Sequence, residues 1–598
     1  MLADKKTNFT LREQASILAG LFSFTKKYWK LFTVSVLSMA AVSAISAYLP
    51  VIVQRYIDNY LATGDATIGI AIRMSLFYLV FVILKMVLVY LKNYTFKIAS
   101  ELTVATMRNK LYGKVVGLGM RYFDQTPTGS VVSRVTNDTE TIKEFWNVFL
   151  TFLDGLLNAI SIGIAMFALN AQLAWIFMGF IPIVFALIYI YQKYSTIIYG
   201  RMRSALSRVN AKLSESITGM TIIQHFNQEE RMKREFDVVN QEYVTARKNM
   251  FKMNALLLMP AVNLIEAIAL FIVLWIFGIR FLENSIANVG MIYAFTSYAK
   301  SFFHPIGNML DSLSVFQDGL VSGSRVMEII NLDEKAPHSN PDATGEITEG
   351  KIEINNLSFS YDNENDVLHD ISISAQPGET IALVGQTGSG KSSIINILMR
   401  FYDYQRGEIL IDGQSIRDIP MKTLRQQMGL VLQDSFMFYG DMADNIRMHG
   451  MYTDQEIKAA AEFVNADDFI EELDGGYHAK VIEGGATFST GEKQLISFAR
   501  TILRSPKILI LDEATANIDT ETEQKISKGL ENMRRGRTTI IIAHRLSTIR
   551  DADKIYVLRQ GRIIEEGKHD ELIEQGGVYY DMYQLQSFQE EEGDYLGE

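Results

Sequence analysis

The 598-residue sequence contains no cysteine. This excludes disulfides, thiolate catalysis and cysteine-based metal sites. The chain also lacks a clustered basic face, so nothing indicates a nucleic-acid partner. The first residues, Met1–Arg12, are mostly polar, and no small-residue cleavage site follows a short apolar core. We therefore do not expect a cleavable signal peptide.

The composition is divided along the chain. The first half contains long apolar runs, whereas the part from about Asn331 resembles an ordinary soluble α/β domain. The net charge is -11, with acidic residues partly concentrated at the C-terminus. A chain of this length is too long for a single hydrophobic core, so we expect several domains.

The apolar runs predict about six membrane-spanning helices, each close to the roughly 20 residues that a bilayer requires. Their expected cores are Leu31–Val53, Met74–Leu91, Phe145–Leu169, Leu173–Tyr191, Leu256–Ile279 and Ala287–Leu310. The sixth is the least regular, because Lys300, His304 and Pro305 interrupt it.

Basic residues orient these spans. Lys and Arg precede the first span and are frequent in the long segments Lys92–Glu144 and Lys193–Lys252. By the positive-inside rule the N-terminus, both long loops and the C-terminal half are cytoplasmic. Both loops contain few Gly or Pro residues and predict helices that continue beyond the membrane, with turns at Phe123–Gly129 and near Gly219.

Two ionisable residues, Lys85 and Glu266, fall inside predicted spans. A charge at membrane depth is costly and usually faces a cavity or a partner. Glu266 is therefore a candidate contact for a cationic substrate or a proton carrier, and a purely structural role is the alternative. The same alternative applies to Lys85.

A phosphate-binding loop follows an apolar strand in the second half of the chain. The segment Gly385–Ser392 fits the pattern G-x-x-x-x-G-K-S and precedes a helix-like run. Its glycines let backbone N–H groups face phosphate oxygens at a helix N-terminus. Lys391 would reach the β- and γ-phosphates, and Ser392 would bind Mg²⁺. The candidate nucleotide contacts here are Gly385, Gln386, Thr387, Gly388, Ser389, Gly390, Lys391, Ser392 and Ser393.

Further polar residues follow apolar strands downstream. Asp512 and Glu513 end one such strand, so Asp512 could hold Mg²⁺ and Glu513 could act as general base on water. Gln433 and His544 also follow strands, and ligands bind at this edge of open α/β sheets. Gln433 could reach Mg²⁺ or the water. Tyr361, upstream of the loop, could stack on adenine.

In order, these motifs resemble one family, the ATP-binding-cassette exporters, over nearly the whole chain. The chain is similar to a half-transporter, in which one membrane domain is fused to one nucleotide-binding domain. Phe123–Gly129 with Asn137-Asp-Thr resembles the first intracellular loop of the family, and Glu215–Gly219 resembles the second. The resemblance implies an all-α six-helix transmembrane domain of type I exporter form, fused to an α/β P-loop nucleotide-binding domain. The expected segments are an N-terminal segment that could contain an elbow helix (1–30), the transmembrane domain (31–330), a linker (331–348), the nucleotide-binding domain (349–585) and an acidic tail (586–598).

The resemblance also implies a mechanism. Two nucleotide-binding domains close on each other, and each ATP lies between one P-loop and the signature motif of the other chain. In this sequence the signature is Phe488–Glu492, with Ser489 and Gly491 as its expected phosphate contacts. Val481–Gly485 resembles the segment that communicates with the tips of the intracellular loops. Glu513, His544 and Gln433 would then serve hydrolysis at the competent site.

The signature departs from the usual L-S-G-G-Q. Thr490 adds a branched side chain where Gly normally allows close approach, and Glu492 adds a carboxylate near the polyphosphate. The D-loop, Ala516–Asp519, also differs from the usual S-A-L-D. An altered signature beside an intact Glu513 favours a heterodimer with a second half-transporter, in which this chain resembles the catalytically intact subunit. Tolerated change in a homodimer is the alternative.

The substrate follows mainly from the resemblance, which implies multidrug export of small amphipathic compounds across the cytoplasmic membrane. Aromatic residues in the spans fit such compounds but also commonly face lipid. A lipid or lipid-linked flippase, a peptide exporter and an ATP-gated channel or regulator remain alternatives. The retention of Glu513 and His544 favours continued turnover, which a pump needs.

Overall fold

The computed structural model describes residues 9–284, 289–433, 435–482, 484–512, 520–542 and 549–585. Contacts divide the chain into two compact units. The membrane unit comprises Met1–Val116 and Thr128–Leu332, and the nucleotide unit comprises Gly117–Pro127 and Asp333–Glu598. The tip of the first cytoplasmic loop therefore belongs to the nucleotide unit, although it lies between two helices of the membrane unit in the sequence.

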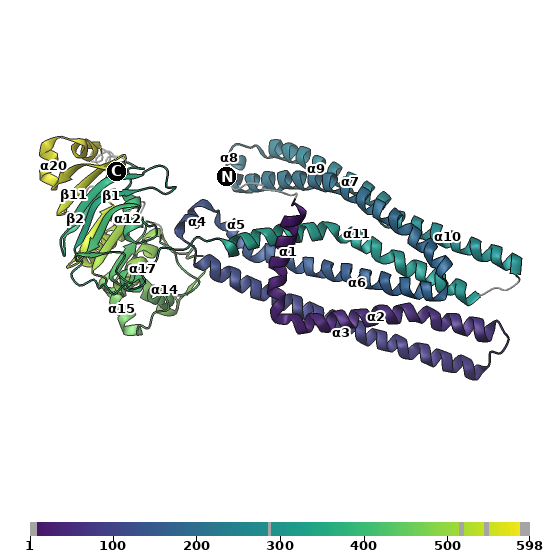
Figure 1. The fold of residues 1–598 in the computed structure, drawn as a ribbon. Helices are drawn as coiled ribbons and strands as arrows, with labels where there is room; N and C mark the ends of the chain where they lie inside the picture. Colours follow the sequence, from purple (N-terminus) through teal and green to yellow (C-terminus); the bar gives the residue numbers. More distant parts are fainter. Residues whose placement is uncertain are drawn as a thin grey trace. The chain divides into compact units, whose positions relative to one another are not determined.

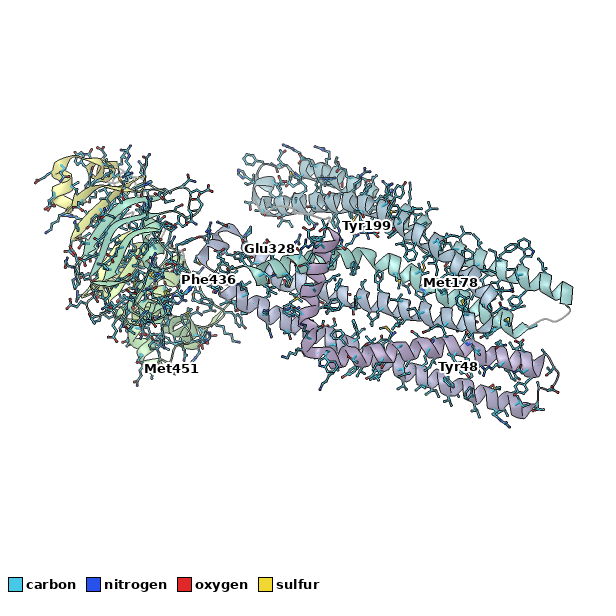
Figure 2. All side chains as sticks on the ribbon, viewed as in Figure 1. Tyr48, Met178, Tyr199, Glu328, Phe436 and Met451 are labelled. Carbon is cyan, nitrogen blue, oxygen red and sulfur yellow. The ribbon has the colours of Figure 1, made fainter. Side chains whose placement is uncertain are left out.

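The membrane unit is entirely helical in its described residues (Figure 1). Its elements are α1 (Leu11–Thr25), η1 (Lys26–Tyr28), α2 (Trp29–Tyr56), η2 (Ile57–Leu61), α3 (Ile68–Val116), α5 (Thr128–Ser133), η3 (Arg134–Asp138), α6 (Thr139–Leu169), α7 (Ala171–Thr218), α8 (Met220–His225), α9 (Glu229–Leu257), α10 (Met259–Asn284) and α11 (Val289–Asn331). Helix α1 crosses the long helices, whereas α6 and α11 run along each other. A capping box, in which Thr10 and Glu13 bond each other's backbone N–H, begins α1.

The long helices extend well beyond a bilayer. Helix α3 has 49 residues and α7 has 48. At about 1.5 Å per residue, each is more than twice as long as the roughly 30 Å hydrocarbon core. Each passes from an apolar half into a charged half without a break, as the scarcity of Gly and Pro in the loops predicts. Helix α7 ends at Thr218, with Gly219 as its C-cap, at the predicted second turn.

Five helical stretches among the described residues are long and apolar enough to cross a membrane. They are Arg12–Leu61, Ile68–Val116, Thr128–Leu169, Ala171–Thr218 and Glu229–Ile279. These contain the first five predicted spans. The sixth predicted span lies largely in α11, which is helical but is not among the five. Helix α11 packs on α6 and α2, and the buried Tyr298 hydroxyl donates to Ala47 O at 2.5 Å.

The nucleotide unit has two larger sheets and a two-stranded ribbon. Its elements are α4 (Met120–Gln125), β1 (Ile352–Phe359), β2 (Leu368–Ala375), β3 (Thr380–Val384), α12 (Lys391–Leu398), β4 (Arg406–Ile411), β5 (Gln414–Ser415), α13 (Met421–Gln427), β6 (Met428–Val431), β7 (Gly440–Asp441), α14 (Met442–Arg447), α15 (Asp454–Phe463), α16 (Asp467–Glu472), η4 (Gly476–His478), β8 (Lys480–Val481), α17 (Thr490–Ile502), β9 (Ile508–Asp512), α18 (Thr520–Arg534), β10 (Thr538–Ile542), β11 (Lys554–Arg559), β12 (Arg562–Gly567) and α20 (His569–Gln575). One sheet has the order β2-β1-β4-β5, and the other has the order β12-β11-β3-β10-β9-β6.

The six-stranded sheet lies between two hydrophobic cores. In β3, Ile381 and Leu383 join the core that contains β1, β2 and α12, whereas Ala382 and Val384 join the core that contains α17 and α18. Alternation of this kind is expected of strands buried on both faces. Strands β9 and β10 divide their side chains in the same way. Figure 1 shows α14, α15 and α17 gathered on one side of the strands.

Candidate nucleotide-binding site

Strand register brings several of the predicted site residues to one edge of the six-stranded sheet. Strands β3, β10, β9 and β6 are parallel neighbours. Ile542 pairs with both Leu383 and Asp512, and Val431 pairs with Leu511. The P-loop after β3, Asp512 at the end of β9 and Gln433 just beyond β6 therefore lie along the same carboxyl edge, where open α/β sheets bind ligands.

The backbone of the P-loop requires glycine at its two ends. Gly390 has a φ of +106°, and a Cβ atom there would lie 2.6 Å from Leu368 Cδ2. At Gly385 a Cβ atom would lie 2.3 Å from Leu558 O. A side chain at either position would clash with a buried strand, so the glycines hold the loop against the sheet. Helix α12 begins immediately afterwards, at Lys391.

The side chain of Lys391 lies under the loop. It is 6% exposed, and its Nζ donates to Gly385 O at 2.6 Å and to Gln386 O at 3.1 Å. Ser389 is 4% exposed, and its Oγ has no hydrogen-bond partner among the described residues. A buried ammonium group, an unsatisfied hydroxyl and the N-terminus of α12 together fit a bound polyphosphate.

The oxygen atoms needed for Mg²⁺ are present at this edge. Ser392 and Gln433 are exposed, and Asp512 is half-buried. Their hydroxyl, amide and carboxylate oxygens are hard ligands, and Mg²⁺ commonly combines one or two carboxylates with substrate phosphates. Among the described residues no group of three or more His, Cys, Asp or Glu side chains could hold a metal without such phosphates.

The two residues expected to carry hydrolysis, Glu513 and His544, lie outside the described residues, as do the D-loop and Glu483. In the sequence Glu513 directly follows Asp512, and His544 follows the end of β10 by two residues. Their assignment remains a prediction from the sequence.

Tyr361 is fixed to the helix that follows the P-loop. Its hydroxyl donates to Ser393 Oγ at 3.0 Å and accepts from Asn396 Nδ2 at 3.3 Å. Both partners lie on α12. Tyr361 is therefore held close to the P-loop helix, as a ring that stacks on adenine requires.

The signature motif caps the start of α17. The Ser489 N–H donates to Glu492 Oε2 at 2.7 Å, and the Glu492 N–H donates to Ser489 Oγ at 3.2 Å. These bonds form a capping box. Ser489 and Thr490 are exposed, whereas Gly491 is buried. The carboxylate of Glu492 is thus held at the helix terminus where a phosphate group would otherwise be favoured.

The membrane unit contains a charged pair that was not predicted from the sequence. Asp154 lies within the predicted span Phe145–Leu169, and its Oδ1 is 3.1 Å from the Nζ atom of Lys92 on α3. The only sign of this pair in the sequence is the single carboxylate of Asp154 within an apolar run. Lys85 and Glu266 are half-buried, and no described residue forms an ion pair with either.

Tyr402, which lies outside the predicted site, contacts Tyr361 and also bonds a residue of α4. Tyr402 packs on Tyr361, with ring centroids 4.8 Å apart. The Tyr402 hydroxyl donates to Asp124 Oδ2 of α4. No sequence motif pointed to Tyr402, and Asp124 was noted only as part of a predicted turn.

Comparisons with known proteins agree with this architecture. The chain matches the ABC transporter transmembrane region over residues 32–306 and the ABC transporter domain over residues 368–516. It is 42% identical over 577 residues to the putative ABC transporter ATP-binding protein exp8 of Streptococcus pneumoniae, covering 96% of this chain and 98% of that protein. It is also 42% identical over 503 residues to the probable multidrug resistance ABC transporter ATP-binding/permease protein YheH of Bacillus subtilis, covering 84% of this chain and 74% of that protein.

A solved structure of a bacterial Atm1-family ABC exporter with ATP bound superimposes with a TM-score of 0.77 at 26% identity, covering 93% of this chain and 98% of that one. The fold is therefore a helical transmembrane domain fused to a nucleotide-binding domain, as predicted. The domain match establishes ATP binding and ATP hydrolysis coupled to transport. The protein is a multi-pass membrane protein whose nucleotide-binding domain is cytoplasmic. The chain belongs to the ABC transporters, as an exporter half-transporter.

Proposed function

We propose that this chain exports amphipathic or hydrophobic compounds of the multidrug type, as one half of a heterodimer with one competent and one degenerate ATP site. The proposal of a heterodimer is supported by one contrast: a complete P-loop and an altered signature occur within the same domain. Lys391 and the buried hydroxyl of Ser389 form an intact phosphate site, whereas Glu492 places a carboxylate at the start of α17. The name of the relative YheH supports the multidrug class.

At the competent site the residues of this chain have distinct tasks. Lys391 turns from the loop carbonyls to the β- and γ-phosphates. Ser392, Gln433 and Asp512 would hold Mg²⁺, which would supply positive charge to neutralise the phosphates. Glu513 accepts a proton from the attacking water, and His544 orients the site around the γ-phosphate. The signature that completes this site comes from the second half-transporter.

At the degenerate site this chain contributes Ser489 and Gly491 with the added charge of Glu492. The hydroxyl of Ser489 already accepts from the Glu492 N–H, and the carboxylate of Glu492 neutralises the positive end of the helix dipole. A phosphate there meets a like charge in place of a neutral amide. A site of this kind retains nucleotide weakly and hydrolyses it slowly.

The membrane unit supplies the substrate pathway. Glu266, half-buried and without an ion-pair partner among the described residues, is our candidate contact for a cationic substrate. A cationic amphipathic dye is therefore a suitable first probe. A lipid-linked substrate would leave such a dye untransported while stimulating the same hydrolysis.

Transport by the assembled pair in inside-out vesicles tests this function. We expect ATP-dependent uphill accumulation of a cationic amphipathic dye, and loss of that accumulation in Glu266→Ala. Accumulation of labelled lipid without dye transport would support a flippase in its place. Dissipation of a gradient on ATP addition, with no uphill movement, would contradict the pump and support a channel.

A further inference from the structure

The short helix α4 is docked on the nucleotide unit through its own flanking backbone. The Ala336 N–H donates to Gly117 O at 3.4 Å. Gly119 lies so close to the linker that a Cβ atom there would be 3.2 Å from Lys335 O. Helix α4 (Met120–Gln125) is joined to the long helix α3, which ends at Val116, and to α5, which begins at Thr128. A movement of α3 or α5 therefore reaches α4 through a connection of only two or three residues on either side.

One side chain of the nucleotide unit reaches α4 with a charged hydrogen bond. The hydroxyl of Tyr402 donates to the carboxylate of Asp124. Tyr402 is 8% exposed, whereas Asp124 is exposed on the surface of α4. Burial raises the pKa of the Tyr402 hydroxyl, and the bond to Asp124 raises this pKa further. The hydroxyl therefore remains protonated and continues to donate throughout the physiological pH range.

The ring of Tyr402 contacts the aromatic residue assigned to adenine. Its centroid is 4.8 Å from that of Tyr361, with the ring planes at 90°. Phe359 packs on both rings, at 4.7 Å from Tyr361 and 5.9 Å from Tyr402. Edge-to-face rings in a packed cluster do not move independently, because each fills space that the others define.

Tyr361 is in turn joined to the P-loop helix through Ser393 and Asn396. A continuous path thus runs from Asp124 through Tyr402 and Tyr361 to α12, and it lies wholly within the nucleotide unit. A cavity of about 330 Å³ borders this path and is lined by Gly119, Met120 and Arg121 together with Tyr361 and Tyr402.

We propose that Tyr402 is a positioning residue, which links the docking of α4 to the orientation of Tyr361 and so to adenine binding. The inference rests on the proposed role of Tyr361 in binding ATP. Coupling between two sites is reciprocal. Nucleotide that orders Tyr361 therefore strengthens the bond from Tyr402 to Asp124, and helix movement that breaks this bond weakens nucleotide binding.

Hydrogen exchange of residues 117–127 in the purified full chain, reconstituted in lipid nanodiscs, tests this link. The probe is the magnesium salt of adenylyl imidodiphosphate, which is not hydrolysed. In the wild type we expect the nucleotide to slow exchange of α4 roughly fivefold or more, a typical coupling between sites. Tyr402→Phe keeps the ring and removes the hydroxyl, and should lose most of this nucleotide-dependent slowing. Asp124→Ala should lose it equally, and because Asp124 is exposed its loss does not endanger folding.

Tyr404→Phe is the matched control. Tyr404 is also buried, but its ring packs under the guanidinium of Arg417 at 4.2 Å, and it makes no hydrogen bond to α4. This variant should behave as the wild type. Equal slowing in Tyr402→Phe and the wild type, or no slowing in a wild type that binds the nucleotide, would overturn the inference. If the wild type bound the nucleotide no better than Lys391→Ala does, this result would contradict the proposed ATP site and also the inference that depends on it.

Discussion

Glu492 and Ser489 bond each other reciprocally at the start of α17, through Ser489 N–H to Glu492 Oε2 at 2.7 Å and Glu492 N–H to Ser489 Oγ at 3.2 Å. A glutamine at position 492 could make the same two bonds. At position 492 the difference from the usual signature is therefore the charge, and not the shape, of the residue that bonds the N-cap Ser489. The branched side chain of Thr490 is a separate difference.

Glu492→Gln separates charge from shape. We expect the variant to fold normally and, in the assembled pair, to bind ATP more tightly at the degenerate site. A carboxylate about 8 Å from a phosphate charge costs about 2 kcal/mol at an effective dielectric constant of about 20, which corresponds to roughly 30-fold in affinity. Equilibrium binding of a fluorescent ATP analogue measures this change.

The control for this variant is Glu456→Gln. Glu456 forms the same capping box with Thr453 at the start of α15, with the Thr453 N–H donating at 2.7 Å. It should lose the same small helix-dipole stabilisation without a change in nucleotide affinity. Equal affinities in Glu492→Gln and the wild type would show that this carboxylate does not weaken the site.

Lys391→Ala removes the buried ammonium group from the P-loop. In the assembled transporter we expect ATP hydrolysis to fall roughly 100-fold or more, as it does when other preorganised electrostatic groups are removed from active sites. Lys422→Ala, at an exposed lysine on α13, should leave the rate unchanged. Steady-state phosphate release measures both variants. A Lys391→Ala rate within a few-fold of the wild type would exclude this loop as the hydrolytic site.

Asp412 makes the stability of the nucleotide unit depend on pH. Burial alone would raise the pKa of its carboxyl, but backbone N–H donors from Thr348, Glu349, Gly350 and Lys351 outweigh burial and lower this pKa. A lowered pKa in the folded state stabilises the protein above the unfolded pKa of about 3.9, and this contribution is lost as the pH falls further.

We therefore expect Asp412→Asn to lower stability by about 1–2 kcal/mol at pH 7, after allowance for partial exposure. For a domain of this size the loss corresponds to a Tm lower by roughly 3–6 °C. The difference from the wild type should shrink at pH 3. Asp474→Asn, at an exposed carboxylate, is the control. A difference that is the same at both pH values would contradict this assignment.

Asp154 neutralises Lys92 within the membrane unit. The Lys92 side chain is 10% exposed and that of Asp154 is 41% exposed. Asp154→Ala leaves a buried ammonium group without its partner, and we expect a loss of about 1–3 kcal/mol, less than for a fully buried pair. Adding Lys92→Met should recover much of this loss.

Glu266→Ala is the comparison, because Glu266 has no ion-pair partner among the described residues and its loss should leave Tm unchanged. Thermal unfolding in detergent compares the variants, and no recovery in the double variant would show that the pair is not the cause.

Local signals account for what could be predicted from the sequence. The spacing of Gly385, Gly390 and Lys391 after an apolar strand is typical of one loop conformation. The P-loop and the helix after it could therefore be predicted from residues that are close together in the sequence. The long helices α3 and α7 likewise follow from uninterrupted runs. The predicted turn at Phe123–Gly129 contains the connection between α4 and α5, but α4 itself, a helix of six residues, is too short for periodicity to reveal.

Contacts between distant residues could not be predicted in this way. Tyr402 and Asp124 are 278 positions apart, and nothing near either residue indicates the other. The pairing of Lys92 with Asp154 spans 62 positions and depends on how α3 and α6 pack. Such contacts are determined by the tertiary fold, whereas the phosphate loop is determined by its own sequence.

We infer that this chain has one competent ATP site, which another chain completes. The most direct test measures ATP turnover by the purified chain alone and after assembly with a half-transporter that carries an unaltered signature. We predict that turnover rises at least roughly tenfold on assembly, and that Glu513→Gln in this chain abolishes it. A stable homodimer of this chain alone with the full turnover of the assembled pair would contradict the claim.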